Sequence, residues 1–141
     1  MHEQQGAISQ VEAIAKKCIL IVEDDPDTAI LLVSAVEQYT PHSPLCVESG
    51  VEAVCIARKK TPALLLLDYF LGDINGLELA DWLHSINGME KVPTIIMSAG
   101  TLSLEKEQQI SARQIIFLRK PFELDELFEK IEVLLTEKGM S

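Results

Sequence analysis

Polar residues capable of chemistry follow four of the apolar runs in this sequence. The acidic triplet Glu23-Asp24-Asp25 comes directly after one run, Asp68 follows a second, and Ser98 and Lys120 follow two more. Carboxylates that lie a few ångströms apart repel each other by about 4 kcal/mol per pair at an effective dielectric constant of about 20. A divalent cation would offset that repulsion, and a site built only from oxygen ligands favours Mg²⁺.

A carboxylate beside such a cation can also act as a nucleophile. Asp68 could attack phosphorus and hold the phosphoryl group as an acyl phosphate. Ser98 and Lys120 would then contact the phosphoryl oxygens, because phosphoryl transfer depends on positioning and on neutralising charge. The residue types therefore indicate phosphoryl chemistry with Mg²⁺ at one site.

Five short apolar runs alternate with segments of helical periodicity, which predicts an α/β fold with a parallel sheet. At least three of the runs are apolar throughout, as is typical of strands buried on both faces. Ligands bind beyond the carboxyl ends of such strands, so the polar residues are predicted to meet there. The predicted strands are Cys18–Val22, Leu45–Glu48, Leu64–Leu67, Thr94–Met97 and Ile115–Leu118.

Five helices are predicted between and after these strands. Ser49 and Glu52 have the spacing of a capping box, which predicts the start of one helix. Apolar residues three and four positions apart predict three others, around Ala29–Val36, Leu79–Ile86 and Leu124 to about Glu137. A further helix is predicted over Leu102–Ser111, a mostly polar segment with Leu104 and Ile110 as its apolar anchors.

Length and composition exclude several kinds of protein. The 141 residues favour a single domain, and the net charge of −10 argues against direct binding of nucleic acid, which needs clustered positive charge. No apolar stretch approaches the ~20 residues of a membrane helix. The first residues lack the pattern of a secretory signal, so membrane insertion is not expected and the cytoplasm is the expected location. Cys18, Cys46 and Cys55 contain no CxxC pair and lie in apolar contexts, which predicts buried free thiols.

Four motifs occur in order along the chain: Ile19–Asp27, Leu64–Asp68 with Gly76 downstream, Pro93–Ala99 and Lys120–Phe122. The separations are 44 residues from Asp24 to Asp68, 30 from Asp68 to Ser98 and 22 from Ser98 to Lys120. Together, the motifs and their spacing resemble the receiver domain of bacterial two-component response regulators, from Cys18 to about Glu137. The resemblance implies a flavodoxin-like, doubly wound sheet with the strand order 2-1-3-4-5.

The same resemblance assigns the acidic residues. It implies that Asp68 is the phosphoacceptor and that Asp24 and Asp68 bind Mg²⁺ directly. Glu23 would contact the metal through a water molecule, and the backbone carbonyl of Phe70 would be a further ligand. Asp25 lies one position beyond the matching pair, although the triplet alone leaves the register open.

Further assignments concern the response to phosphorylation. The resemblance implies that Ser98 and Lys120 contact the phosphoryl group. Ser98 and Phe117 would form the switch that changes a protein-binding face. The Lys120–Pro121 peptide bond would be cis, an isomer that is open to bonds preceding proline.

The sequence also departs from the family pattern. Gly72 stands where a proline is usual, Arg113-Gln114 replaces a common Gly-Ala, and Phe70 and Gly100 are apolar. None of these departures removes a residue assigned to the chemistry.

Taken one at a time, the candidate residues have ordinary structural explanations. The acidic triplet could be a solvated turn or a helix cap, and Asp68 could be a cap at a strand end. Ser98 could form a turn, Lys120 could be a surface lysine, and Phe117 could fill the core. Their order and spacing together favour the functional interpretation.

Three functions from different classes stay open. The first is a receiver that is phosphorylated on Asp68, and the second is a receiver-shaped protein-interaction module that is not phosphorylated. The third is a Mg²⁺-dependent phosphohydrolase with Asp68 as its nucleophile. Phosphatases of the haloacid dehalogenase type place a second aspartate two residues after the nucleophile, where this chain has Phe70, which disfavours the third function.

The favoured function is a signalling receiver and not an enzyme. Its expected phosphate donor is a sensor histidine kinase or a histidine phosphotransfer protein, and its downstream protein target is not identified by the sequence. The predicted organisation is a polar N-terminal extension over residues 1–17, a receiver domain over residues 18–137 and a tail over residues 138–141. Self-association into a homodimer stays open.

Overall fold

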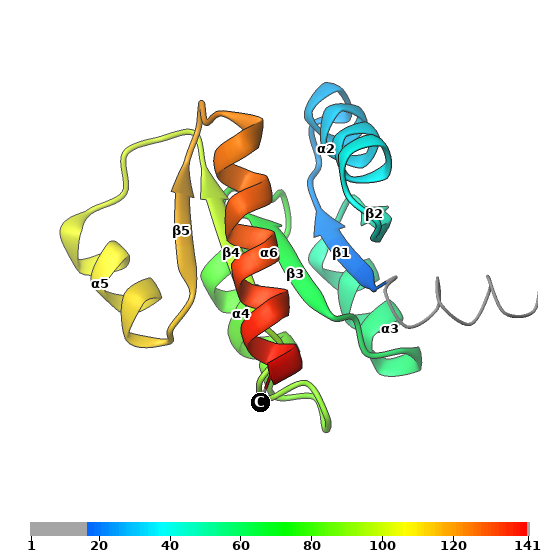
Figure 1. Cartoon of the computed structure of the whole chain (residues 1–141). Helices are drawn as coiled ribbons and strands as arrows, with labels where there is room; N and C mark the ends of the chain where they lie inside the picture. Colours follow the sequence, from blue (N-terminus) through cyan, green and yellow to red (C-terminus); the bar gives the residue numbers. More distant parts are fainter. Residues whose placement is uncertain (1–16, 141) are drawn as a thin grey trace, which may run out of the picture.

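A computed structural model describes residues 17–140 of the chain, with side chains described as far as Thr136. Five parallel strands form one sheet in the order β2-β1-β3-β4-β5 (Figure 1). The strands are β1 (Cys18–Val22), β2 (Ser43–Val47), β3 (Leu64–Asp68), β4 (Thr94–Ser98) and β5 (Ile116–Arg119). This arrangement confirms the predicted flavodoxin-like α/β fold. Apart from Lys17, the predicted extension over residues 1–17 lies outside the described residues.

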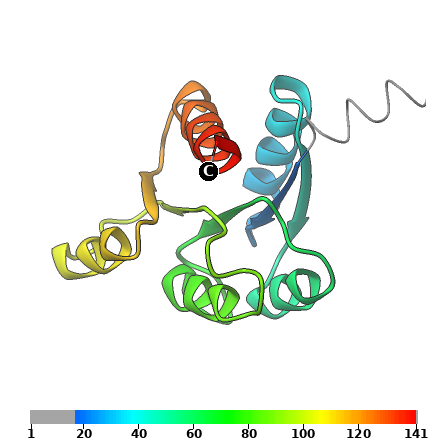
Figure 2. The same ribbon diagram turned by 60° about the horizontal axis from the view of Figure 1, so that its bottom comes forward.

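Helices cover both faces of the sheet, as predicted. The five helices are α2 (Pro26–Tyr39), α3 (Gly50–Lys59), α4 (Gly76–His84), α5 (Leu104–Ala112) and α6 (Leu124–Met140). Helices α2 and α6 lie on the face opposite α3 and α4 (Figure 2), whereas α5 lies beside β5 at one end of the sheet (Figure 1). Within residues 17–140, no helix combines the length and the apolar character needed to cross a membrane.

Two of the three inner strands, β3 and β4, are buried along their whole length. In β3, Leu65 and Leu67 belong to the apolar cluster on the side of α3 and α4, whereas Leu64 and Leu66 belong to the cluster on the side of α2 and α6. Successive side chains of a strand point to opposite faces, so a strand covered on both faces is apolar at every position. Burial of each leucine stabilises the fold by about 1.5–3 kcal/mol. These buried strands therefore fix the positions of the residues that follow them.

Several boundaries differ from the predicted ones, and β2 and the end of α6 are two of them. β2 spans Ser43–Val47 and not Leu45–Glu48. It lies at the edge of the sheet and its side chains are only partly buried, so its apolar pattern is weak. Pro44 fits there because an edge strand leaves some backbone positions without a sheet partner. Helix α6 continues to Met140, past the predicted end near Glu137, and apolar spacing fixes helix ends less well than helix centres.

Helix α3 begins at the predicted cap, although its capping box is incomplete. The Ser49 hydroxyl accepts the backbone N–H of Glu52 at 3.2 Å. The Glu52 carboxylate, however, accepts the N–H of Glu48 at 3.1 Å and not that of Ser49. A complete capping box starts α4, between Asn75 and Glu78.

The prediction for the cysteines is wrong in part. All three are free thiols, but Cys55 is exposed and Cys18 and Cys46 are only partly buried. Cys55 follows Ala53 and Val54, which point into the core, so the next position on the helix turns outward. An apolar neighbourhood in the sequence therefore did not indicate burial on an amphipathic helix.

Candidate functional site

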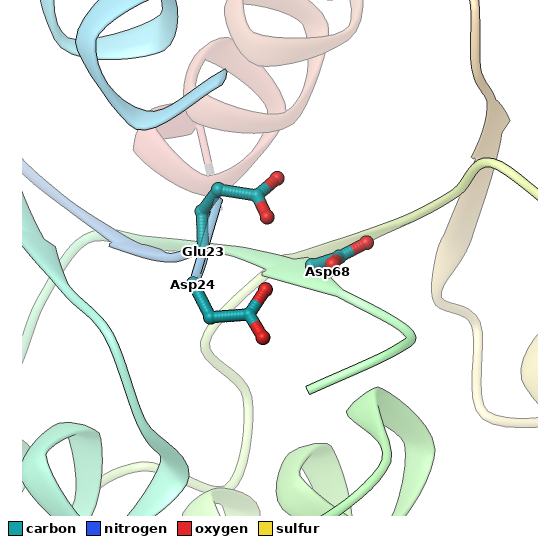
Figure 3. Close-up of side chains that lie close together, drawn as sticks. All are labelled: Glu23, Asp24 and Asp68. Atoms are coloured by element: carbon teal, nitrogen blue, oxygen red, sulfur yellow. The ribbon is translucent and has the colours of Figure 1, made fainter. Parts of the chain in front are cut away.

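The carboxyl ends of β1 and β3 bring three of the predicted acidic residues together (Figure 3). Glu23 and Asp24 follow β1, and Asp68 is the last residue of the neighbouring strand β3. One carboxylate oxygen of each residue lies within 4.8 Å of those of the other two. Glu23 is 1% exposed and Asp68 is 6% exposed, whereas Asp24 lies at the surface. This is the predicted acidic cluster, and it opens to solvent at Asp24.

Lys120 brings positive charge to this cluster from the end of β5. Its ammonium group donates to Glu23 Oε1 at 2.9 Å and to Asp68 Oδ1 at 3.4 Å. The backbone N–H of Lys120 donates to the Ser98 carbonyl at 2.8 Å, and the Lys120–Pro121 peptide bond is cis. The fold therefore directs this lysine into the site and not onto the surface.

Burial changes the charge balance of the cluster. Removal from water, followed by the Glu23 carboxylate, raises the pKa of Asp68 to about 6, although Lys120 acts in the opposite direction. Burial alone would lower the pKa of Lys120, but its contacts with Glu23 and Asp68 raise that pKa, so the ammonium stays charged. One ammonium then contacts two members of a cluster of three carboxylates. Clustered oxygen ligands with excess negative charge fit a Mg²⁺ ion.

Asp25, the third member of the acidic triplet, caps α2. Its carboxylate accepts the backbone N–H of Thr28 at 2.9 Å and the Thr28 hydroxyl at 2.7 Å. These two bonds lower the pKa of Asp25. The triplet thus serves two purposes, since Glu23 and Asp24 belong to the cluster and Asp25 is the helix cap that the sequence also allowed.

Phe70 and Gly100 lie next to each other beside the cluster. The Phe70 side chain is 52% exposed, and a Cβ placed on Gly100 would lie 3.3 Å from Phe70 Cε2. The Phe70 ring also packs edge-on against Tyr69, with 4.9 Å between ring centroids. Because Phe70 is two residues beyond Asp68 and Gly100 is two beyond Ser98, the ring spans the space between the ends of β3 and β4.

The proposed switch residues do not touch the acidic cluster in this structure. Ser98 is buried at the end of β4, where its hydroxyl donates to the Gly100 carbonyl at 3.2 Å. Phe117 in β5 is partly buried and packs against the apolar cluster on the side of α3 and α4. The fold places Ser98 one strand from Asp68, but its hydroxyl is turned away.

Gly76 has a structural role that the sequence analysis missed. A Cβ at this position would lie 2.6 Å from the Asp68 carbonyl oxygen and 2.9 Å from Tyr69 Cα. The Gly76 N–H also donates to the Tyr69 carbonyl at 2.7 Å. The loop after β3 can fold back this closely because glycine has no side chain.

An apolar groove of about 430 Å³ opens beside the acidic cluster. One wall is Leu31 and Leu32 of α2, and the other includes Phe122 and the aliphatic part of the Lys120–Pro121 segment. Ile30 and Leu31 are 66% and 54% exposed, although both are large apolar residues. Exposed apolar residues gathered beside a polar site are typical of a protein-binding surface.

Comparisons with known proteins agree with the fold. A family model described as the response regulator receiver domain matches residues 19–132. The chain is similar to the solved signal receiver domain of a putative Luxo repressor protein from Vibrio parahaemolyticus, with a TM-score of 0.80 and 26% identity over 89% of this chain and 94% of that one. These likenesses confirm the resemblance that the four sequence motifs indicated.

Curated relatives include one short and one long protein. The polar-differentiation response regulator DivK of Brucella ovis is 27% identical over 84% of this chain and 96% of its own length. The signal transduction histidine-protein kinase BarA of Escherichia coli is 27% identical over 89% of this chain, which spans only 14% of that kinase. The same domain thus occurs as nearly a whole protein and as a small part of a larger one.

The raised pKa of Asp68 predicts a dependence of stability on pH in the absence of metal. The pKa is higher in the folded state than in the unfolded chain, so ionisation of Asp68 favours unfolding. Asp68→Asn should therefore raise the free energy of unfolding by about 1–3 kcal/mol near pH 7.5. The gain should be full above about pH 6 and fade toward about pH 4, where both states are protonated.

Urea denaturation in the presence of a chelator, repeated across this pH range, measures the difference. Glu129→Gln, which removes an exposed carboxylate on α6, is the matched control and should change little. A gain for Asp68→Asn that does not vary with pH would contradict the assignment.

Proposed function

The chain belongs to the response regulator receiver domain family, and on this basis we propose that residues 18–137 accept a phosphoryl group on Asp68 from a phosphohistidine. The donor would be a sensor histidine kinase or a histidine phosphotransfer protein. The observation that carries the proposal is the buried Asp68 carboxylate beside Glu23, Asp24 and the ammonium of Lys120. The protein would act as a signalling module whose phosphorylation state is read by another protein.

The transfer exchanges one bond for another. An oxygen of the ionised Asp68 carboxylate attacks phosphorus, the bond between phosphorus and the histidine ring nitrogen breaks, and that nitrogen takes the electron pair. Lys120 would neutralise charge on the phosphoryl oxygens, because its ammonium already lies 3.4 Å from Asp68. A pKa of about 6 leaves most of Asp68 ionised at neutral pH.

The acidic cluster would hold Mg²⁺ through Asp24 and Asp68 directly, through Glu23 by way of water, and through the Phe70 backbone carbonyl. When bound, the ion supplies positive charge between the carboxylates and the incoming phosphate. The support is the oxygen-only donor set and the excess of carboxylates over ammonium groups at the cluster.

The switch would start from the observed state of Ser98. Its hydroxyl now donates to the Gly100 carbonyl and would turn to donate to the phosphoryl group. Phe117, which is only partly buried, would change its rotamer as the β4–α5 loop moves. The surface around α5, β5 and α6 would then present a different face to the downstream protein.

The partner that carries the phosphohistidine would dock on the apolar groove beside Lys120. This groove opens next to Asp68, so a protein seated in it would bring its histidine to the acidic cluster. The exposed side chain of Leu31 lines the groove from α2 and would be covered by the partner. The relation to the kinase BarA and to the response regulator DivK agrees with a partner of this class.

The first test concerns the site of phosphorylation. With Mg²⁺ and a small donor such as acetyl phosphate, the protein should gain one phosphate that is stable in mild acid and labile in base, as measured by intact-mass spectrometry. Asp68→Ala should gain none. Asp24→Ala, or a chelator, should slow labelling at least about tenfold, because Mg²⁺ would be held less tightly.

Asp125→Asn, at an exposed position in the first turn of α6, is the control and should label normally. Equal labelling of Asp68→Ala would show that the site is misassigned, and labelling that is unaffected by chelator would exclude the metal role. A wild-type protein that no donor labels would favour the unphosphorylated module, and sustained release of phosphate from many substrates would favour the phosphohydrolase.

A second test separates docking from chemistry. Leu31→Glu places a charge at the rim of the groove, so transfer from a phosphorylated histidine kinase that labels the wild type should slow by about tenfold or more. Labelling by acetyl phosphate should be unchanged, because Leu31 does not contact Asp68. Val133→Glu, on an exposed part of α6, is the control. An equal loss with both donors would contradict the docking role.

A third test concerns the lifetime of the acyl phosphate. The Phe70 ring lies against Gly100, so it shields the phosphoryl group from water and offers no hydrogen bond to position one. Phe70→Asn should therefore shorten the lifetime by roughly tenfold. The loss of phosphate is timed after removal of the donor.

Tyr39→Asn, which removes an exposed ring on α2, is the control and should not change the lifetime. Gly100→Glu tests the other side of the opening. If Phe70→Asn holds its phosphate as long as the wild type, the shielding role is wrong and access beside Gly100 sets the rate.

A further inference from the structure

The loop between β3 and α4, residues 69–75, is tied to α3 by the side chain of Asp73. This carboxylate accepts the backbone N–H of Gly50 at 3.2 Å and that of Val51 at 3.3 Å. The first N–H groups of a helix have no acceptor within the helix, so an outside carboxylate satisfies them. The negative charge also interacts favourably with the positive end of the helix dipole. Asp73 therefore caps a helix that it does not precede in the sequence.

Close packing accompanies these bonds. A Cβ at Gly50 would lie 2.6 Å from Ile74 Cγ2, so the residue after Asp73 rests directly on the α3 backbone. Ser49 caps the same helix in a different way, by accepting the Glu52 N–H within the first turn. Helix α3 thus has a local cap, Ser49, and a cap from a distant part of the chain, Asp73. The bonds of Asp73 also hold the loop against α3.

The loop needs an anchor because of its composition. Gly72, directly before Asp73, is exposed, and no heavy atom lies within 4 Å of where its Cβ would be. A glycine with open space around it allows the backbone many conformations. The start of the loop is fixed by the Tyr69 N–H, which donates to the Met97 carbonyl at 2.7 Å, and its end by Gly76. In between, an antiparallel bridge joins Phe70 to Asn75, Leu71 and Ile74 pack against the apolar core, and Asp73 ties this part of the loop to α3.

We propose that Asp73 is a positioning residue for the Asp68 site. By holding the loop to α3, it sets the place of Phe70, whose carbonyl is a proposed Mg²⁺ ligand and whose ring lies against Gly100. This inference rests on the proposed function, because it concerns the same metal and the same phosphoryl group. Asp73 itself touches neither; it acts through the backbone that carries Phe70.

Two variants that each remove one cap of α3 separate this role from helix stability. Asp73→Ala should raise the dissociation constant for Mg²⁺, measured by calorimetric titration with MgCl₂, by about tenfold, as is typical when a group that orients a ligand is lost. Ser49→Ala is the matched control and should change it less than about twofold, although the helix loses a cap in both. Asp73→Asn should keep most of the affinity, because the amide oxygen still accepts an N–H.

Amide hydrogen exchange gives a readout that does not depend on metal. The N–H of Gly76, which closes the loop onto Tyr69, should exchange several-fold faster in Asp73→Ala and at the wild-type rate in Ser49→Ala. Adding Gly72→Ala to Asp73→Ala should recover part of the Mg²⁺ affinity, because alanine has room there and narrows the loop's conformations. No recovery would contradict the role given to Gly72.

The proposal is overturned if Asp73→Ala binds Mg²⁺ like the wild type, or if Ser49→Ala weakens binding equally. Failure of the proposed function looks different. A wild-type protein that binds Mg²⁺ but takes no phosphate on Asp68 would contradict the function and leave the titrations decisive for Asp73. If the wild type binds no Mg²⁺, the exchange rates decide, and equal rates at Gly76 in the two variants would overturn the proposal.

Discussion

The burial of two carboxylates side by side, those of Glu23 and Asp68, is the constraint on which the rest of the site depends. Burying charge in such a place is costly unless a partner of opposite charge is present. Lys120 is that partner, and its ammonium reaches both carboxylates at 2.9 and 3.4 Å. Because the three groups come from the ends of β1, β3 and β5, these strands must end at the same edge of the sheet.

The sheet meets this demand by extending its hydrogen bonding one residue past the strands. The N–H of Glu23 donates to the Val47 carbonyl at 3.1 Å, and that of Lys120 donates to the Ser98 carbonyl at 2.8 Å. The residue after Asp68 does the same toward β4. The side chains of Glu23, Asp68 and Lys120 therefore project from backbone that is still held by the sheet.

The apolar runs and the polar residues that follow them predicted most of this arrangement. A strand covered on both faces is apolar at every position, so its end is clear in the sequence. Glu23, Asp24, Asp68 and Lys120 were predicted as one group for that reason, and the structure brings them together. The contact between Asp73 and α3 could not be predicted, since it joins residues 23 positions apart through a loop without periodicity. Hydroxyl orientation is likewise set by local geometry and not by residue type. The direction of the Ser98 hydroxyl is a detail of this kind.

The central strand has a consequence for the chain before it is folded. Leu64–Leu67 is an uncharged apolar segment that is protected from aggregation only when helices cover both of its faces. Until then it could pair with the same segment of another copy, as exposed apolar strands do in aggregates. Asp68 follows this segment directly, and Lys59 and Lys60 lie shortly before it, so charges flank it on both sides. The net charge of −10 adds repulsion between chains. The carboxylate at the centre of the site is therefore also one of the charges that flank this apolar segment.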